Sequence, residues 1–429
     1  MKIRLFYNKE GLVLDVPEKS VGKIFETKKV QKVNESDIRE KILDSPKFFG
    51  LKNLIRKNTK VCIVVSDVTR PIPYREFLPF VLEGLNKFGV KDSQINFLIA
   101  TGCHRPNSSN EQKKMLGEKV VERYKIENHD AFDLSKHIYL GRTKKNTPVY
   151  INRKYLEAGV KITIGMIEPH FMAGFSGGRK IICPGICAYE TTKWTHSPFF
   201  LENENSRIGN LEGNVFHREL SEIARKAEPN FSINVVVNYK REVVGIFAGD
   251  LASSFLKGVE FCKELCFDYS PYKYETVITS GGGYPLDTTF YQTIKAIVNA
   301  SQIVKEDGII IVLSSIREGI GSKQFVEIIK NYRDEREFLN FYSREENFAL
   351  DQWQMEEFLK VARKNIKIYL YTDAPHSLEL LEKKLKIKII KRISELLNLI
   401  QSLKEPMAVI PEGPYVAPIF GEKRNLKRK

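Results

Sequence analysis

Residues 60–71, KVCIVVSDVTRP, place a short apolar run directly before a polar loop. The run is rich in β-branched residues and does not alternate with polar ones, which is typical of a strand covered on both faces of a parallel sheet. The next segment, residues 74–90 (YREFLPFVLEGLNKFGV), has the apolar spacing of an amphipathic helix and ends near a glycine. A strand, a polar loop and a helix in this order predict an α/β sheet.

The same order recurs along the chain. QINFLIATG (residues 94–102) and VKITIGMIEPH (160–170) each predict a strand that enters a loop. A tyrosine- and proline-rich connection, residues 268–274, precedes a second series of strand-like runs: ETVITS, GIIIVLSSI, IKIYLYTD, KIKII and PMAVIPEG. We therefore predict two α/β domains with mainly parallel sheets and a cleft between them, an N-terminal domain at 1–270 and a C-terminal domain at 271–429. The first 17 residues are predicted to form a strand pair.

Length and composition favour a soluble, two-domain globular protein. A chain of 429 residues exceeds one ordinary core, and its 42% hydrophobic and 28% charged content is that of globular proteins. No apolar run reaches the length of a membrane-spanning helix, and the N-terminus lacks the apolar core of a secretory signal. The 6 cysteines are sparse and form no CxxC pair. Reduced thiols and a cytoplasmic location are expected.

The formal net charge of +15 permits a nucleic-acid interpretation. The basic residues are, however, mixed with acids along the chain. The one dense basic cluster is EKRNLKRK at residues 422–429, which we interpret as a solvated end. A basic protein also suits small anionic substrates, so the charge by itself leaves both interpretations open.

The loops that follow the predicted strands carry the chemistry-bearing residues. Ser66, Asp67, Thr69 and Arg70 in SDVTRP suit a phosphate, a ribose or a carboxylate, although a helix cap with an internal Asp–Arg pair explains them equally well. In TGCHRP, His104 follows a strand and can exchange protons near neutrality, although a single histidine is more often structural.

A third loop, residues 167–185 (IEPHFMAGFSGGRKIICPG), combines His170, glycines and Lys180. Gly174, Gly177 and Gly178 permit a positive φ and a close approach of backbone to a ligand, or simply a tight turn. His196 follows 26 positions after His170, without the further ligands that a dedicated zinc site needs. In a fourth loop and helix, SGGGYPLDTTFYQTIKA, Gln292 and Lys295 share a helix face and could hold a carboxylate or face water.

Taken in order, six segments of the chain resemble the nickel-pincer lactate racemase family: SDVTRP, TGCHRP, EPHFMAGFSGGRKIICPG, TTKWTHS, GGGYPLDTTFYQTIK and DQWQ. The resemblance spans residues 66–353, and the stretch that joins EPH, GFSGG, lysine, PG and histidine is the most specific part. It implies a 2-hydroxy acid racemase or epimerase that works by hydride transfer. The implied cofactor is a nickel-pincer nucleotide, a pyridinium mononucleotide whose thioamide and thiocarboxylate sulfurs and one carbon hold nickel.

The resemblance also implies a role for each matching residue. Lys180 corresponds to the covalent attachment point, His196 to the protein ligand of nickel, and His104 and His170 to the proton-exchanging pair. The other matches are cofactor contacts at Asp67, Thr69, Gly177, Gly178 and Trp353, and substrate contacts at Arg70, Gln292 and Lys295, the last also counted as catalytic. Arg179, Cys183 and Cys187 stand where relatives are expected to have small or apolar residues. Cofactor-biosynthesis proteins are implied as transient partners.

Two other interpretations remain at this point. A pyridoxal-phosphate enzyme with Lys180 as its Schiff-base lysine would share the lysine and an anion cradle, but would leave the loop histidines unexplained. A non-enzymatic nucleic-acid binder would use the basic charge, but would leave the glycine–histidine loops unexplained. The sequence does not name the 2-hydroxy acid, and lactate is the first expectation.

Overall fold

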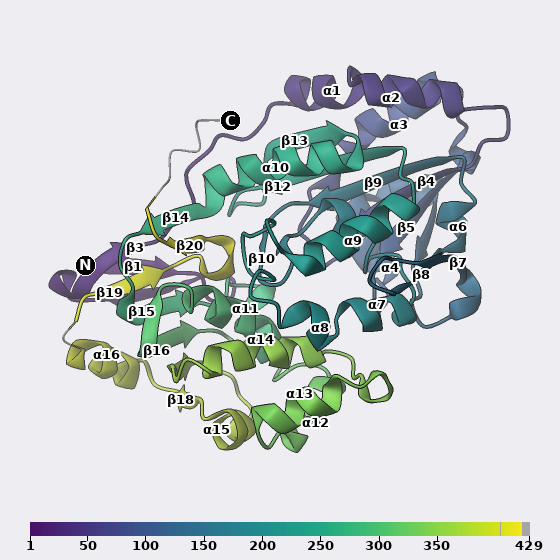
Figure 1. Cartoon of the computed structure of the whole chain (residues 1–429). Coiled ribbons are helices and arrows are strands. Elements are labelled where there is room, and N and C mark those ends of the chain that lie inside the picture. The colour runs from purple at the N-terminus through teal and green to yellow at the C-terminus, as the bar shows by residue number, and fades with distance from the viewer. Residues whose placement is uncertain (404, 423–429) are drawn as a thin grey trace.

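Two parallel sheets organise the chain in the computed structural model, which describes residues 1–403 and 405–422 (Figure 1). The first sheet has strand order β13-β12-β9-β4-β5-β6. Its strands are β4 (Val61–Ser66), β5 (Ile95–Ala100), β6 (Lys125–Asn128), β9 (Val160–Met166), β12 (Phe231–Val237) and β13 (Val243–Gly249). All neighbours pair in parallel except the edge strand β13, which is antiparallel to β12.

Strand β4 shows why the apolar run of the opening segment becomes a central strand. All of its residues are buried. Ile63 and Val65 pack in one core with Ile42 and Leu78, from the helices α1 (Glu35–Leu43) and α3 (Leu78–Lys87). Val64 points into the core on the opposite face. Successive side chains of a strand point to opposite faces, so a strand covered on both sides must be apolar throughout.

The second sheet has strand order β18-β17-β16-β15-β19-β3 and is parallel throughout. Its strands are β3 (Val21–Ile24), β15 (Tyr274–Ser280), β16 (Val304–Leu313), β17 (Lys367–Tyr371), β18 (Lys388–Ile390) and β19 (Met407–Ile410). One face is covered by α11 (Phe290–Ala300) and other helices. The other face packs on α16 (Ile393–Ser402) and on the hairpin β1 (Lys2–Leu5)–β2 (Leu12–Asp15).

The predicted N-terminal strand pair is present, but it belongs with the second sheet. Ile3, Leu5 and Leu14 pack against Ile278 and Ile311 of β15 and β16, and β3 extends the second sheet beside β19. A division into 1–270 and 271–429 therefore does not follow the sheets at the N-terminus. The physical reason is that the edge of β19 presents backbone groups that need hydrogen-bond partners, which β3 supplies, and that one face of the second sheet is apolar and is covered by the β1–β2 hairpin.

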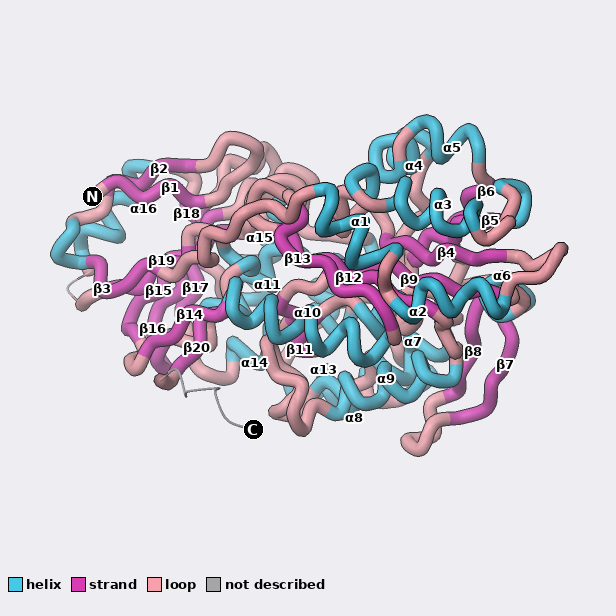
Figure 2. Tube along the Cα trace, turned by 90° about the horizontal axis from the view of Figure 1, so that it is seen from above, coloured by secondary structure: helices cyan, strands magenta, loops and turns pink. Residues whose placement is uncertain are grey.

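The remaining elements connect or flank the two sheets, and Figure 2 shows the antiparallel pair β7–β8 standing out beside the first sheet. The other helices are α2 (Pro46–Gly50), α4 (Ser109–Leu116), α5 (Glu118–Arg123), α6 (Arg153–Leu156), α7 (Tyr189–Thr195), α8 (Pro198–Leu201), α9 (Val215–Lys226), α10 (Leu251–Cys266), α12 (Lys323–Asn331), α13 (Glu335–Tyr342), α14 (Gln352–Ala362) and α15 (Glu379–Leu385). The other strands are β7 (His137–Arg142), β8 (Pro148–Asn152), β10 (Pro169–His170), β11 (Gly174–Phe175), β14 (Phe267–Ser270) and β20 (Ala417–Phe420).

Three smaller expectations can be compared with the structure. All 6 cysteines are free thiols, in keeping with the predicted reduced state. Among the described residues, no helix has both the length and the apolar character needed to cross a bilayer. The basic cluster at 422–429 lies outside the described residues except for Glu422.

Candidate active site

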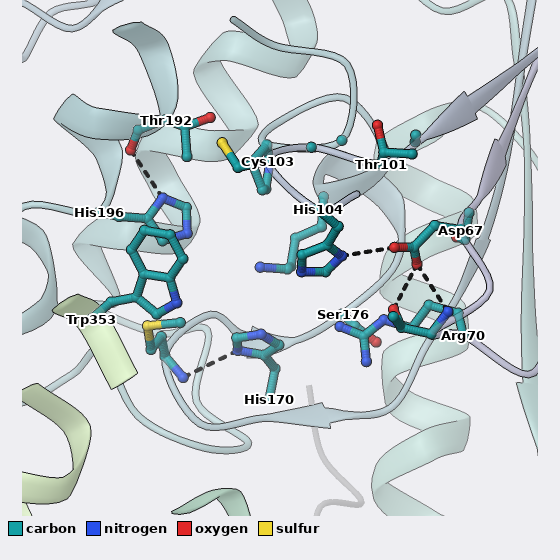
Figure 3. A pocket seen from close by; sticks show the side chains of 18 of the residues that line it. Asp67, Arg70, Thr101, Cys103, His104, His170, Ser176, Thr192, His196 and Trp353 are labelled. Atoms are coloured by element: carbon teal, nitrogen blue, oxygen red, sulfur yellow. Dashed lines mark hydrogen bonds and ion pairs between the residues drawn. The ribbon is translucent and has the colours of Figure 1, made fainter. Parts of the chain in front are cut away.

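A cavity of about 170 Å³ lies where the carboxyl ends of β4, β5 and β9 face the N-terminal ends of α11 and α14. The carboxyl edge of a parallel sheet is where such folds place ligand-binding loops. Figure 3 shows side chains from both halves of the chain that converge there. The cavity is lined by these predicted site residues: Asp67, Thr69, Arg70, His104, His170, Gly177, Lys180, His196, Gln292, Lys295 and Trp353.

The loop after β4 delivers a buried carboxylate to His104. Asp67 is 5% exposed, and its Oδ2 lies 2.7 Å from Nδ1 of His104. Burial alone would raise the pKa of Asp67, but His104, Thr69 and Arg70 together lower it, so this side chain is a carboxylate. A carboxylate on Nδ1 fixes the tautomer and leaves the lone pair of Nε2 free. His104 is therefore prepared to accept a proton on its cavity side (Figure 3).

Arg70 does not form the internal pair with Asp67 that the sequence allowed. Its guanidinium instead forms an ion pair with Glu168, in the loop after β9. Asp67 accepts hydrogen bonds from the backbone and hydroxyl of Thr69. Glu168 belongs to the EPH motif, and its place directly after a predicted strand is a sequence signal for a site residue, although no role was predicted for it. Glu168 orients Arg70 at the cavity wall.

His170 is buried, and its Nδ1 accepts hydrogen bonds, whereas Nδ1 of His104 donates one. Its Nδ1 accepts hydrogen bonds from the backbone N–H groups of Met172 and Ala173, at 3.2 and 3.3 Å. Two donors on Nδ1 place the ring proton on Nε2. Burial, followed by the charges of Lys180, Arg70, Lys295 and Arg179, holds the pKa of His170 well below its ordinary value. His170 is thus a neutral imidazole that offers an N–H, whereas His104 offers a lone pair.

The double glycine shapes the turn that precedes Lys180. Gly177 has φ +76°, and a Cβ there would lie 2.9 Å from the carbonyl oxygen of Met166. Gly178, at φ +49°, would place a Cβ 2.6 Å from the ring of Phe255, and its N–H donates to Oδ1 of Asn234. Gly177 lines the cavity. Gly178 does not, because its amide is already bonded to the neighbouring strand β12, so its expected ligand contact has no counterpart in this geometry.

Lys180 opens onto the cavity from the short 3-10 turn Gly178–Ile181. Burial, and then the positive charges of Arg179 and Arg70, lower the pKa of Lys180 to about 7. Lys295, on α11, is lowered to a pKa of about 7 by burial and by Arg70, partly offset by the two carboxylates nearby. Both amines lie far below the ordinary lysine pKa of about 10.4. With a pKa of about 7, each amine is about half neutral, and so partly nucleophilic, near pH 7.

Arg179, the residue that departs from the expected small side chain, is 2% exposed. Its Nη2 donates to the carbonyl oxygen of Ala173 at 2.6 Å, and its guanidinium lies over the ring of Phe255 at 4.3 Å. Within the described parts of the chain it forms no ion pair with a carboxylate. Its charge therefore acts on Lys180 with little compensation.

The depressed pKa of Lys180 leads to a prediction that requires no cofactor. Acetylation of the free protein by acetic anhydride should label Lys180 with a midpoint near pH 7, because only the neutral amine reacts and protonation below that pH removes its lone pair. Peptide mass spectrometry across a pH series measures the midpoint. Arg179→Met should move it to higher pH, since a positive neighbour is removed. A midpoint near pH 10 in the native protein would contradict the depressed pKa.

His196 ends α7 and turns one ring nitrogen toward the cavity. Its Nδ1 faces the carbonyl oxygen of Thr192 at 3.1 Å, which fixes the proton on Nδ1. Burial lowers the pKa of His196 to about 3, so the ring is neutral, as a metal ligand must be. The ring packs between Phe216 and Trp353, with centroids at 5.0 and 4.9 Å. In the described chain, no protein group hydrogen-bonds Nε2.

The second sheet's helices close the cavity from the other side. Oε1 of Gln292 is buried without a hydrogen-bond partner, and it lines the cavity. Trp353 is held in place by a hydrogen bond from its Nε1 to the hydroxyl of Tyr291 at 3.0 Å. Tyr291 was not singled out from the sequence, although it directly precedes Gln292 on the same helix. An orphaned buried acceptor at a cavity wall is a place where a ligand donor fits.

The cavity holds basic groups that could contact an anion: Arg70, Lys180 and Lys295. The carboxylates of Asp67 and Asp351 also line it, and Glu168 pairs with Arg70 beside it. Asp67 and Asp351 already have partners in His104 and Ser322. No cluster of three or more His, Cys, Asp or Glu side chains fit for a metal occurs in residues 1–403 and 405–422. A metal at His196 would therefore need its remaining ligands from a bound cofactor.

Comparisons with known proteins match nearly the whole chain to one family. The model "Lactate racemase N-terminal domain" matches residues 7–209, and "Lactate racemase C-terminal domain" matches residues 270–417. A lactate racemase from Thermoanaerobacterium thermosaccharolyticum is 34% identical over 380 residues, 87% of this chain and 88% of the relative. A lactate racemase from Lactiplantibacillus plantarum is 35% identical over 335 residues, 77% of this chain and 78% of the relative.

Solved structures agree in fold. The lactate racemase apoprotein from Thermoanaerobacterium thermosaccharolyticum superposes with a TM-score of 0.88 at 31% identity, covering 97% of this chain and 100% of the other. A protein from Thermotoga maritima superposes with a TM-score of 0.69 at 18% identity, covering 92% of this chain and 100% of the other, and shares the fold.

Proposed function

The chain belongs to the lactate racemase family and is a racemase of that kind, and from this premise we propose that it inverts 2-hydroxy acids by hydride transfer with a nickel-pincer nucleotide tethered to Lys180. The family's metal is nickel. The observation that supports the proposal is that a lysine with a pKa of about 7, a neutral buried histidine with a free Nε2 and two further histidines line one cavity. The pyridoxal-phosphate and nucleic-acid interpretations receive no support from the family or from this geometry.

The residues present fit such a cofactor. A tether by acylation needs a neutral amine, which Lys180 provides. A single histidine suffices for nickel only when the other ligands belong to the cofactor, and His196 is the one neutral imidazole here with a carbonyl on its far nitrogen. Gly165 and Gly177 both line the cavity, and an added Cβ on Gly165 would lie 3.3 Å from Cα of Gly177, so the absence of side chains lets these two backbone segments pack closely at the cavity wall.

The chain's own groups can then bind and orient the substrate. Arg70 and Lys295 hold the carboxylate, one from each side of the cavity. Fixing the carboxylate lets C2 turn between two faces without leaving the site. When bound, the cofactor supplies an electrophilic carbon that accepts hydride and returns it. Trp353 and the helix α14 shield this centre from water.

The two histidines divide the proton work. Nε2 of His104 accepts the hydroxyl proton, and the carboxylate of Asp67 stabilises the imidazolium that forms. After C2 turns over, the carbonyl oxygen faces Nε2 of His170. For this half-reaction His170 would first take a second ring proton from solvent on Nδ1. Its Nε2 would then give its proton to the oxygen as hydride returns to C2, which leaves His170 neutral. For the opposite enantiomer the roles reverse, and Nε2 of His170 accepts the hydroxyl proton. This requires the ring proton of His170 to lie on Nδ1 and the two backbone hydrogen bonds to Nδ1 to be released. The racemase therefore uses one histidine on each side of the substrate.

The direct experiment is a racemisation screen. Protein loaded with nickel-pincer nucleotide should abolish the optical rotation of a single enantiomer of a short 2-hydroxy acid, lactate among them, and the protein without cofactor should not. Chiral chromatography follows both enantiomers. Cofactor-biosynthesis proteins would be the transient partners that deliver the group to Lys180.

His196→Ala tests the metal assignment. The variant should bind less than about a tenth of the nickel of the native protein, since loss of a ligand or of its orienting partner typically costs 10–100-fold in metal affinity. Intact mass should still show the organic part on Lys180. Metal analysis gives the occupancy, with His217→Ala as the control, because His217 is a half-buried histidine that does not line the cavity. Full nickel occupancy in His196→Ala would overturn the assignment.

A further inference from the structure

A second, smaller cavity of about 50 Å³ adjoins the first on the side of His170. The two share Thr69, Arg70, His170, Phe171, Leu286 and Lys295 as walls. Beyond these, the small cavity is lined mainly by apolar groups: Pro71, Pro169, Pro285, Pro414, Ile208 and the half-buried Tyr415. Its one further charged group, Glu168, is paired with Arg70. An apolar recess thus opens beside the groups that hold the substrate's carboxylate.

The surroundings of the two histidines are unequal. The side chain of His104 is 54% exposed, so its side of the cavity opens toward solvent. His170 is 7% exposed, and its side ends in the apolar recess. This inequality matters because of the stereochemistry of inversion at a fixed site.

A racemase that uses one hydride acceptor must present both enantiomers to it. The carboxylate is held by Arg70 and Lys295, and the C2 hydrogen points at the acceptor in both cases. With two of the four substituents fixed, the enantiomers differ by exchanging the hydroxyl group and the side chain. When the hydroxyl faces His104, the side chain faces His170, and the reverse holds for the other enantiomer. The substrate side chain must therefore fit on both sides.

We infer that the apolar recess beside His170 receives the substrate side chain and restricts racemisation to 2-hydroxy acids with short aliphatic side chains. This inference rests on the proposed function and adds the substrate class. On the His104 side the open mouth sets no close limit. On the His170 side the recess does, because a cavity of roughly 150 Å³ is needed to hold a benzene ring. The available space suits about two to four carbon atoms, counting the first carbon in the main cavity.

The recess also favours side chains larger than methyl. Each methylene group moved from water into an apolar site gains about a four-fold factor in binding. Lactate leaves the recess empty. Ethyl and isopropyl side chains fill it, and an aromatic ring exceeds it. An aromatic 2-hydroxy acid would bind as one enantiomer, with its ring toward His104, and would not be inverted.

The experiment compares lactate, 2-hydroxybutyrate, 2-hydroxyisovalerate and 3-phenyllactate as substrates of the loaded enzyme. The value of kcat/KM should rise about four-fold from lactate to 2-hydroxybutyrate and further to 2-hydroxyisovalerate. Racemisation of 3-phenyllactate should fall below about one hundredth of the 2-hydroxyisovalerate rate, and only one of its enantiomers should inhibit. Lactate as the best substrate, or full racemisation of 3-phenyllactate, would overturn the inference.

Ile208 provides the matched variants, because its side chain lines the recess and not the main cavity. Ile208→Phe should fill the recess and lower the preference for 2-hydroxyisovalerate over lactate at least ten-fold. Ile208→Ala should enlarge the recess and admit 3-phenyllactate, while Ile208→Val should behave as the native protein. Variants that leave the substrate ranking unchanged would contradict a role for the recess.

A binding measurement separates failure of this inference from failure of the proposed function. The matching 2-oxo acids, pyruvate, 2-oxobutyrate and 2-oxoisovalerate, can be titrated into the protein without cofactor, with Trp353 fluorescence as the signal. The affinity should rise with side-chain length in the native protein, and this trend should be lost in Ile208→Phe. If no acid is racemised, the proposed function fails, and the affinity ranking still decides the recess.

Discussion

Lys180→Ala is expected to abolish racemase activity and to leave the protein without any covalent cofactor. The reason is that, among residues 1–403 and 405–422, the one other amine that lines the cavity is Lys295, which reaches it from the opposite wall on α11. Intact mass of native and variant protein, each exposed to the cofactor pathway, should differ by the mass of the group in addition to the substitution. Lys180→Arg should behave like Lys180→Ala, because a guanidinium keeps the charge but is not acylated.

Lys193→Ala is the matched control for this experiment. Lys193 lies on α7, and its Nζ forms a salt bridge with Glu345 at 3.1 Å, outside the cavity. The control variant should carry the cofactor and racemise as the native protein does. An adduct retained in full on Lys180→Ala would place the tether elsewhere and remove the basis of the proposed mechanism.

His170→Gln is expected to slow racemisation by about 10²–10⁴-fold, the typical contribution of a positioned proton donor or acceptor. Glutamine keeps an N–H donor at this position but cannot exchange a proton. The substitution therefore distinguishes proton transfer from simple hydrogen bonding. Simple hydrogen bonding is a real alternative, because the hydrogen bonds to Nδ1 of His170 place its ring proton on Nε2, where it can act as a donor. Retention of more than a tenth of the native rate would show that hydrogen bonding suffices.

His104→Gln should cause a loss of the same size, with a different signature in the half-reactions. Rapid quenching of single-turnover mixtures measures the 2-oxo acid formed from each enantiomer. His104→Gln should block its formation from one enantiomer, and His170→Gln from the other. Asp67→Asn should weaken the His104 half-reaction alone, since Asp67 contacts His104 and not His170. Equal losses from both enantiomers in every variant would contradict the division of roles.

Local sequence patterns were sufficient to predict most elements of the fold. The apolar runs at β4, β5, β9, β15, β16 and β17 are strands in parallel sheets, as their β-branched composition and lengths indicated. The helix over Gln292 and Lys295 is α11, and both side chains line the cavity from one face of it. Strands of this kind can be predicted from local sequence because burial on both faces requires a continuous apolar run, independently of the rest of the chain.

The sequence also limited the chemistry of the site. The order of histidines, glycines and lysine between residues 167 and 196 resembled one family, and the family comparisons confirmed that membership. The residue types were enough for this, because a tether requires an amine and a proton exchange near neutrality requires an imidazole. The individual roles of Lys180, His196 and the other site residues stay predictions.

Only the tertiary structure decided the partners, the tautomers and the positions of these groups. In the structure Arg70 pairs with Glu168 instead of Asp67, and His104 and His170 have opposite tautomers. The amide of Gly178 bonds away from the cavity, and the N-terminal strand β3 joins the second sheet. Each of these depends on which group a side chain meets across the fold. The depressed pKa of Lys180 has the same origin, because desolvation and the field of Arg179 and Arg70 exist only once the chain surrounds the amine.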